Sequence, residues 1–174
     1  MYIKFWGVRG SVPSGNPETV RVGGNTTCVE IRCDKELIVI DTGTGFRNLG
    51  LSLMKELPVN GTILFSHVHW DHIQGFPFFN PFFVPGNEFR VFGGTSLPLT
   101  VEEVLKQQMN PPCFPVKTDL FGAKISYHDV KPGEIIEGEN YKITLAPLYH
   151  PNGCYAYRVD SEGQSLVFAT DCEH

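Results

Sequence analysis

Short apolar runs separated by glycine-rich or polar turns occur along most of the chain and predict a protein built mainly from strands. The runs 26–33 and 36–40 are joined by a very short polar turn, so we expect these two strands to pair. The full set of predicted strands covers residues 2–6, 26–33, 36–40, 62–65, 88–92, 124–130, 134–136, 141–148, 154–159 and 165–169.

Two segments have the spacing of amphipathic helices instead. Residues 46–57 repeat apolar side chains at helical intervals, and Pro58 follows as a stop signal. Residues 100–109 open with the Thr-x-x-Glu pattern of a capping box, formed by Thr100 and Glu103. A few helices added to many strands predict the α+β class.

The segment 76–86 contains five phenylalanines and three prolines, and this proline density excludes a regular helix. Packing in the core is one interpretation, because aromatic side chains dominate protein interiors. A rigid aromatic wall beside a site, a lid and a dimer contact are the others.

Composition is that of one soluble globular domain spanning residues 1–174, with 41% hydrophobic and 19% charged residues. A net charge of −5 without a Lys/Arg run makes nucleic acid an unlikely partner without excluding it. No signal peptide is visible, and no apolar run approaches the ~18 residues of a membrane helix. Five scattered cysteines without a Cys-x-x-Cys pair favour reduced thiols. We therefore expect a cytoplasmic protein with no membrane contact.

The chemistry of the chain concentrates at 66–72, directly after the apolar run 62–65. This stretch reads His67-x-His69-x-Asp71-His72, an ordered mixture of imidazoles and a carboxylate. Such donors suit zinc, iron or manganese. Tracts that are rich in histidine only by composition lack this order, so a solvated turn is the weaker interpretation.

Further candidate ligands follow other predicted strands. His150 comes after 141–148 and Asp171 after 165–169, and strand ends are where a rigid scaffold presents side chains. His67 and His69 are two apart, so an extended backbone points both to one side. Asp71 and His72 fall at a helix start and point elsewhere, which suggests two metal subsites.

Three other features have open interpretations. Asp41 ends a strand and is either a helix cap or a partner for a metal-ligating histidine. Arg9 is either a phosphate contact or a structural ion pair. The pair Gly23-Gly24 is either a plain turn or a phosphate cradle. His128 matches no motif and is taken as structural.

Together these motifs resemble the metallo-β-lactamase superfamily, and within it the branch of phosphodiesterases and ribonuclease Z. The residues that carry the likeness are 5–11, 23–28, 40–43, 66–72, 150–151 and 170–171. The resemblance implies a four-layer αββα sandwich.

The resemblance also implies roles for the candidate residues. The first metal would be held by His67, His69 and His150, and the second by Asp71 and His72. Asp171 would bridge the two, Asp41 would orient a ligand, and Asp71 would be the catalytic residue. The family implies two zinc ions, with iron or manganese as alternatives.

The expected activity is hydrolysis of a small-molecule or nucleotide-like phosphodiester by a hydroxide held at a one- or two-metal site. A thioester, lactone or β-lactam hydrolase of the same fold is an alternative, and a non-catalytic metal-binding remnant is another. A flavodiiron-type oxidoreductase is less favoured, because it would usually place Glu where His69 stands.

Family members continue with further strands and a late histidine that has no counterpart in this chain. We therefore expect a sandwich that is incomplete in its second half, an intact first subsite and a weaker second one. The chain would be a fragment, or a short form completed by another chain or as a homo-oligomer. His174 as a replacement ligand is the third interpretation.

Overall fold

A six-stranded sheet forms the centre of the structure, a computed structural model that describes residues 1–173. The first three strands are antiparallel, and the last four, from β3 onward, are mutually parallel. The predicted pairing of the second and third strands is confirmed. In spatial order the strands are β1 (Tyr2–Gly7), β2 (Cys28–Cys33), β3 (Glu36–Ile40), β4 (Asn60–Leu64), β5 (Glu88–Gly93) and β6 (Lys124–Asp129).

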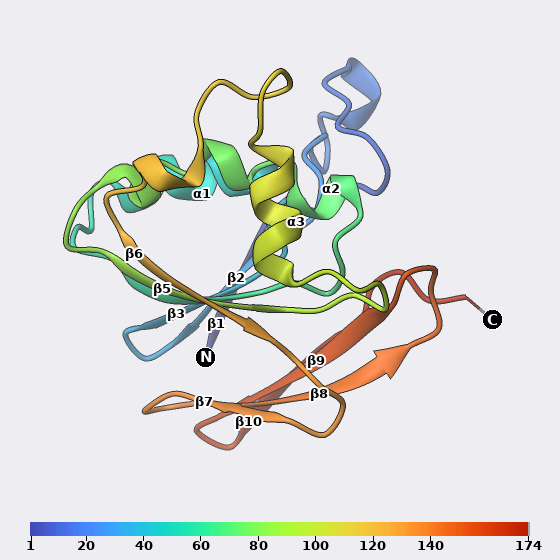
Figure 1. Cartoon of the computed structure of the whole chain (residues 1–174). Coiled ribbons are helices and arrows are strands. Elements are labelled where there is room, and N and C mark those ends of the chain that lie inside the picture. The colour runs from blue at the N-terminus through green and yellow to red at the C-terminus, as the bar shows by residue number, and fades with distance from the viewer. Residues whose placement is uncertain (174) are drawn as a thin grey trace.

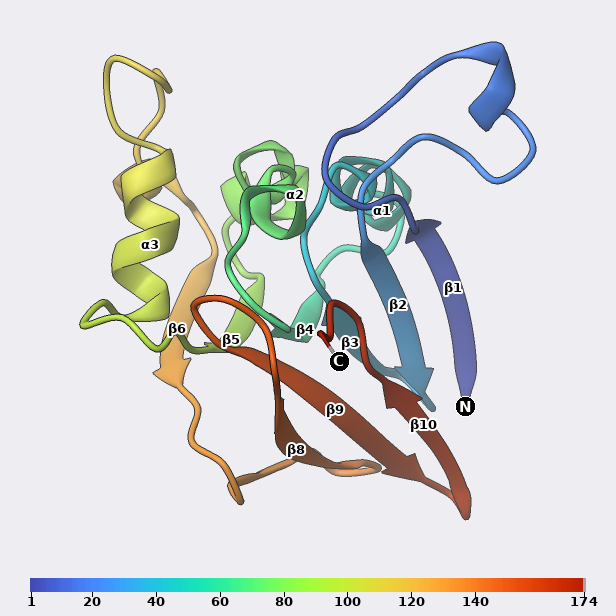
Figure 2. The same cartoon turned by 90° about the vertical axis from the view of Figure 1, so that its right-hand side faces the viewer.

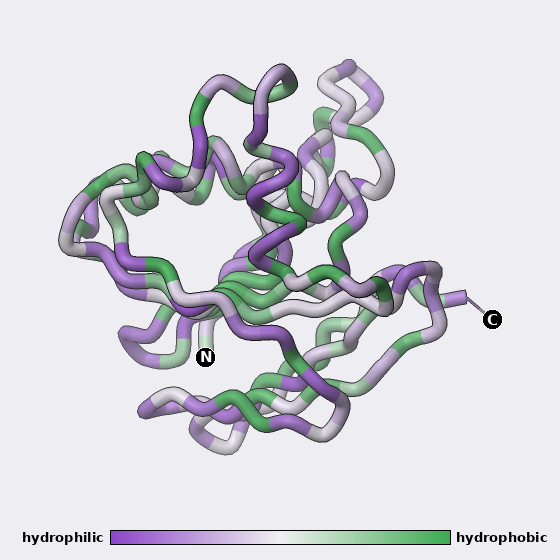
Figure 3. The backbone as a smooth tube through the Cα atoms, in the orientation of Figure 1, coloured by the Kyte–Doolittle hydropathy of each residue, from purple (hydrophilic) through white to green (hydrophobic). Residues whose placement is uncertain are grey.

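A second sheet of four antiparallel strands packs against one face of the first (Figure 1). Between the sheets lies a buried cluster that includes Ile31, Ile143 and Val159. Hydrophobic segments line the strands in this region (Figure 3). The strands, in spatial order, are β10 (Gln164–Phe168), β9 (Cys154–Ser161), β8 (Lys142–Leu148) and β7 (Ile135–Glu137).

Three helices cover the opposite face of the six-stranded sheet (Figures 1 and 2). They are α1 (Gly45–Leu53), α2 (Trp70–Ile73) and α3 (Val101–Gln108), and α3 carries the predicted capping box. The α+β class is confirmed, with the layers ordered helix, sheet, sheet. Within residues 1–173 no helix covers the outer face of the four-stranded sheet. None of the helices in this range has the length and apolarity needed to cross a bilayer.

The first helix ends earlier than its apolar spacing predicts. Leu53 is fully buried, whereas Leu57 is 37% exposed and so adds nothing to the buried stripe. The backbone tightens after Leu53, because the Lys55 N–H donates to the carbonyl of Ser52, three residues back. The expectation of a helix continuing to residue 57 is therefore wrong.

The aromatic segment 76–86 forms two 3₁₀ helices, Phe76–Phe78 and Asn80–Phe83, and its main role is core packing. Phe76, Phe79 and Phe82 are fully buried beneath α1. Phe79 stacks on Phe46 with ring centroids 3.9 Å apart. Among the interpretations of this segment, the structure favours the core.

Between β1 and β2 the chain makes a long excursion that closes on itself. The Ser14 N–H donates to the carbonyl of Gly24, and a Cβ at Gly24 would lie 1.6 Å from the Ser14 carbonyl oxygen. Only glycine fits at this approach. The glycine pair thus serves loop closure.

The direction of the strands brings the candidate ligands together. The carboxyl ends of β3 and β4 meet at one edge because the two strands are parallel. In the other sheet β8 and β10 both run antiparallel to β9, so their ends also share an edge. The Tyr155 N–H donates to the Ser66 carbonyl at 2.8 Å, and this bond joins the two edges.

Replacing Phe79 by Ala should lower the free energy of unfolding by about 3–5 kcal/mol, because the change leaves a cavity beneath α1. Phe83→Ala is the matched control, since Phe83 is 39% exposed, and it should cost about 1 kcal/mol or less. Urea denaturation followed by circular dichroism measures both. Equal midpoints for the two variants would contradict the core assignment.

Candidate metal centre

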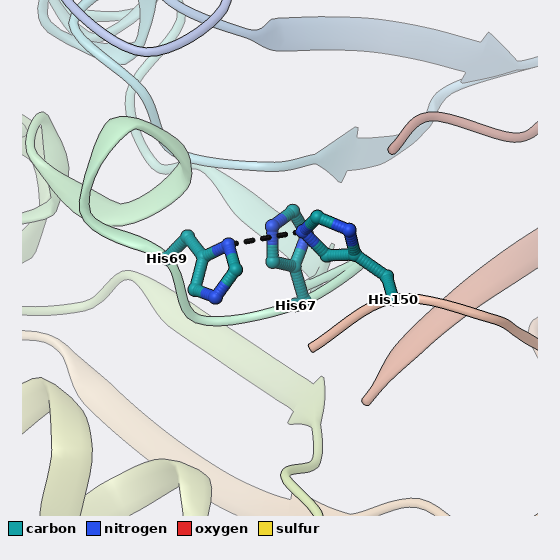
Figure 4. A group of neighbouring side chains, drawn as sticks. All are labelled: His67, His69 and His150. Atoms are coloured by element: carbon teal, nitrogen blue, oxygen red, sulfur yellow. Dashed lines mark hydrogen bonds between the residues drawn. The ribbon is translucent and has the colours of Figure 1, made fainter. Parts of the chain in front are cut away.

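Three imidazoles converge at the rim where the two sheets meet (Figure 4). His67 and His69 follow β4, and His150 follows β8. One ligand atom from each lies within 4.8 Å of the others. His69 Nδ1 and His150 Nε2 are 3.1 Å apart, close to the ~3.3 Å between two nitrogens that each lie ~2.0 Å from one tetrahedral ion.

A second group shares one member with the first. His67, His72 and Asp171 also place their ligand atoms within 4.8 Å of one another. Asp171 Oδ2 is 3.2 Å from His72 Nε2, 3.5 Å from His67 Nε2 and 4.0 Å from His150 Nε2. This oxygen therefore lies between the two groups.

Asp41 is completely buried and accepts three hydrogen bonds that organise the rim. The backbone N–H and the hydroxyl of Ser66 each donate to it at 2.8 Å. His72 Nδ1 donates to Asp41 Oδ2, also at 2.8 Å, so the proton on Nδ1 leaves His72 Nε2 as the free ligand atom. Asp41 is therefore the partner of a candidate ligand histidine and not a helix cap, because its side chain caps none of the described helices.

The protonation states suit metal ligands, which must be neutral imidazoles or ionised carboxylates. Burial, followed by the neighbouring His72 and His69, lowers the pKa of His67 to about 3. Burial and His150 lower the pKa of His69 as well. Burial alone would raise the pKa of Asp171, but the charges of His72 and His67 outweigh it and lower that pKa.

The Asp41–His72 pair differs from the other histidines. Burial works to lower the pKa of His72, but the hydrogen bond with Asp41 and the nearby carboxylates outweigh it and raise that pKa. Burial also raises the pKa of Asp41, against the opposing effect of its hydrogen bonds to His72 and Ser66. His72 therefore keeps its imidazolium form to higher pH than an ordinary histidine, so a metal ion at Nε2 would have to displace a proton there.

Asp71 lies beside the second group without belonging to it. Its Oδ2 is 3.5 Å from His72 Nε2 and accepts a 2.7 Å hydrogen bond from the Ser11 backbone N–H. Ser11 has a φ of 68°, an uncommon conformation for a residue other than glycine. The excursion between β1 and β2 is thereby attached to the rim.

The donor set fits divalent metal ions. His67 Nε2 is buried and has no hydrogen-bond partner within residues 1–173. An orphaned buried nitrogen facing other ligand atoms is the arrangement that a bound ion satisfies. The first group would offer three nitrogens, and the second would offer nitrogens and carboxylate oxygen, both combinations that zinc accepts.

Several residues at the rim were not singled out by sequence reasoning. The Ser66 hydroxyl lies 3.1 Å from His67 Nδ1, and the Cys154 thiol lies 3.8 Å from the same atom. Burial raises the pKa of Cys154 to about 12, which keeps it a neutral thiol. Glu173 Oε1 is 3.5 Å from His150 Nδ1. Of these residues, only Ser66 could have been found from the sequence, because it directly precedes the histidine stretch.

The remaining candidates lie outside both groups. Arg9 donates from Nε to the carbonyl of Val12 and makes no ion pair within residues 1–173. It also lines a cleft of about 200 Å³ beside His72 and Asp171. His128 stacks on Phe92 and belongs to neither ligand group. All five cysteines are free. The alternative involving His174 falls outside the described residues.

Comparison with known proteins matches most of the chain to one protein family. The model of the beta-lactamase superfamily domain matches residues 36–174. Ribonuclease Z of Methanothermobacter thermautotrophicus is 28% identical over 158 residues, which cover 86% of this chain and 45% of that protein. The chain spans about half the length of the curated relatives it matches.

Two solved structures show the same fold. The metallo-beta-lactamase fold protein YhfI from Bacillus subtilis superposes with a TM-score of 0.69 at 20% identity, covering 97% of this chain and 61% of that one. A diphosphatase from the PhnP family superposes with a TM-score of 0.64 at 23% identity, covering 90% of this chain and 61% of that one. The prediction of an αββα-type sandwich that is incomplete in its second half is confirmed, since the described residues form three of the four layers and the chain covers only part of both structures. The chain belongs to the beta-lactamase superfamily and has the metallo-beta-lactamase fold.

Proposed function

We propose that this protein is a metal-dependent hydrolase of phosphodiester bonds that uses two zinc ions. The observation that carries the proposal is the pair of ligand groups joined by His67, with Asp171 Oδ2 between them. Two adjacent ions supply an activated water and stabilise the charge that develops on the attacking and leaving oxygens. Ribonuclease Z and diphosphatase relatives support a hydrolase of this class.

The residues of the chain prepare the site for that chemistry. Asp41 holds His72 through Nδ1 and thereby fixes the direction of Nε2. The Ser11 N–H occupies one oxygen of Asp71 and leaves Oδ1 without a hydrogen bond within residues 1–173. Asp71 and Asp171 would both offer carboxylate oxygen to bound metal, and Asp71 would alternatively accept a proton from water.

The cleft lined by Arg9 supports a phosphate-containing substrate. It lies beside His72 and Asp171. Within residues 1–173 Arg9 forms a side-chain hydrogen bond only through Nε, so both terminal nitrogens remain available. A guanidinium pairs with phosphate oxygens in a planar, two-point geometry. The scissile group of a thioester or a lactam, unlike that of a phosphodiester, carries no anionic oxygen of its own. The net charge of −5 favours a small phosphodiester over RNA, which the ribonuclease Z relatives make the second substrate class to test.

Zinc-loaded protein should hydrolyse bis-p-nitrophenyl phosphate and leave a β-lactam and a thioester unchanged, because Arg9 selects phosphate. Loss of a residue that hydrogen-bonds a metal ligand typically lowers metal affinity or rate by ~10–100-fold. His69→Ala removes a ligand itself, so metal affinity and hydrolysis rate should both fall by more than that. Metal analysis and absorbance assays give the two readouts.

His128→Ala is the matched control for that experiment, because His128 is an exposed histidine outside both groups. It should keep metal content and rate. Hydrolysis of the lactam or thioester in preference to the phosphodiester would reject the proposed substrate class. Full metal content in His69→Ala would reject the proposed ligand set.

Asp41→Asn tests the hydrogen bond behind His72. Asp41 has a φ of 61°, which Asn tolerates, so the backbone should keep its shape while the charged acceptor is lost. Zinc affinity should fall by about 10–100-fold. Asp34→Asn makes the same change at an exposed residue with a φ of 53° and should leave zinc affinity unchanged. Equal affinities measured by competition with a chromogenic chelator would contradict the role of Asp41.

A further inference from the structure

A separate cavity of about 290 Å³ lies at the edge of the six-stranded sheet opposite the candidate metal centre. It is lined by residues at the amino ends of β3, β4 and β5, whose carboxyl ends lead toward the metal rim. Tyr141, directly before β8 of the second sheet, also lines it. A cavity of this size is at the lower end of the roughly 300–1,000 Å³ range of ligand pockets and suits a small molecule.

Arg90 is the principal charged group of this cavity. Its guanidinium donates to the hydroxyl of Tyr141 at 2.7 Å, to the hydroxyl of Thr62 at 3.0 Å and to the carbonyl of Glu137 at 3.2 Å. All three acceptors are neutral oxygens, and Arg90 forms no ion pair within residues 1–173. Its Nε–H donates to none of the described residues, so both the positive charge and a donor are available.

The two carboxylates that line the cavity are already engaged. Glu88 pairs with Lys124 at 2.7 Å. Glu36 accepts hydrogen bonds from the backbone N–H groups of Glu139 and Asn140. Neither carboxylate therefore neutralises Arg90 by direct contact.

Two further donors border the same space. Asn60 uses its Oδ1 to accept the Glu88 N–H at 2.9 Å, while its Nδ2 has no hydrogen-bond partner in the described part of the chain. Lys35 lies in the turn before β3, is exposed and lines the cavity. An amide, an ammonium and a guanidinium thus line one cavity, and each has a donor without a partner among residues 1–173.

We propose that this cavity binds a small oxyanion, a phosphate or a short carboxylate, with Arg90 as its principal contact. Guanidinium groups form charge-assisted hydrogen bonds with both kinds of anion, and the Nε–H of Arg90 is the donor left for one. Asn60 and Lys35 complete the donor set. The site is distinct from the metal rim and does not depend on the hydrolase activity proposed above.

Isothermal titration of the full chain with inorganic phosphate and, separately, with malonate tests this site. We expect saturable 1:1 binding of at least one anion at constant ionic strength set by chloride. Arg90→Gln should weaken it about tenfold or more, because a hydrogen bond to a charged group is lost. Lys35→Glu should weaken it about three- to tenfold, since the exposed ammonium contributes less. Lys55→Glu makes the same charge change at an exposed lysine outside the cavity and should leave binding within about twofold.

Arg90→Gln also removes bonds that join the two sheets, so Lys35→Glu keeps the test decisive if that variant fails to fold. His69→Ala tests whether phosphate binds at the metal rim instead. In that case His69→Ala would lose phosphate binding and Lys35→Glu would retain it. That pattern would overturn the proposal. Absence of saturable binding, or equal weakening by Lys35→Glu and Lys55→Glu, would also overturn it and would leave Arg90 as a link between the sheets.

Discussion

The arrangement of the metal rim depends on one buried carboxylate. Asp41 has no access to solvent, and an ionised group in that position is stable only when its oxygens are fully hydrogen-bonded. Ser66 and His72 supply those bonds from the segment after β4. The same contacts set the path of the chain through the histidine stretch. These hydrogen bonds therefore both stabilise the buried Asp41 carboxylate and position the candidate ligands.

The sequence was most informative where chemistry and strand ends coincide. His67, His69, His150 and Asp171 were placed at strand ends from apolar runs alone, and the parallel and antiparallel directions of β4, β8 and β10 bring them to one rim. Apart from the pairing of β2 with β3, periodicity could not show which strands would be neighbours. The family resemblance supplied that step.

Other features depend on tertiary contacts that leave no local pattern. The Ser11 N–H reaches Asp71 across 60 residues, and a backbone donor has no signature in side-chain types. Cys154 approaches His67 only because β9 docks on the end of β4. The early end of α1 has the same origin, since the core cluster beneath the helix covers Leu53 and leaves Leu57 exposed.

His69 and His150 are 81 residues apart and belong to segments that leave different sheets. An ion held by both would act as a non-covalent cross-link between the sheets, beside the hydrogen bond from Tyr155 to Ser66. A ligand that binds only the state in which the two sheets are docked stabilises that state, and the stabilisation grows with the logarithm of the free ligand concentration. The zinc level around the protein would then set the strength of sheet association as well as the occupancy of the rim.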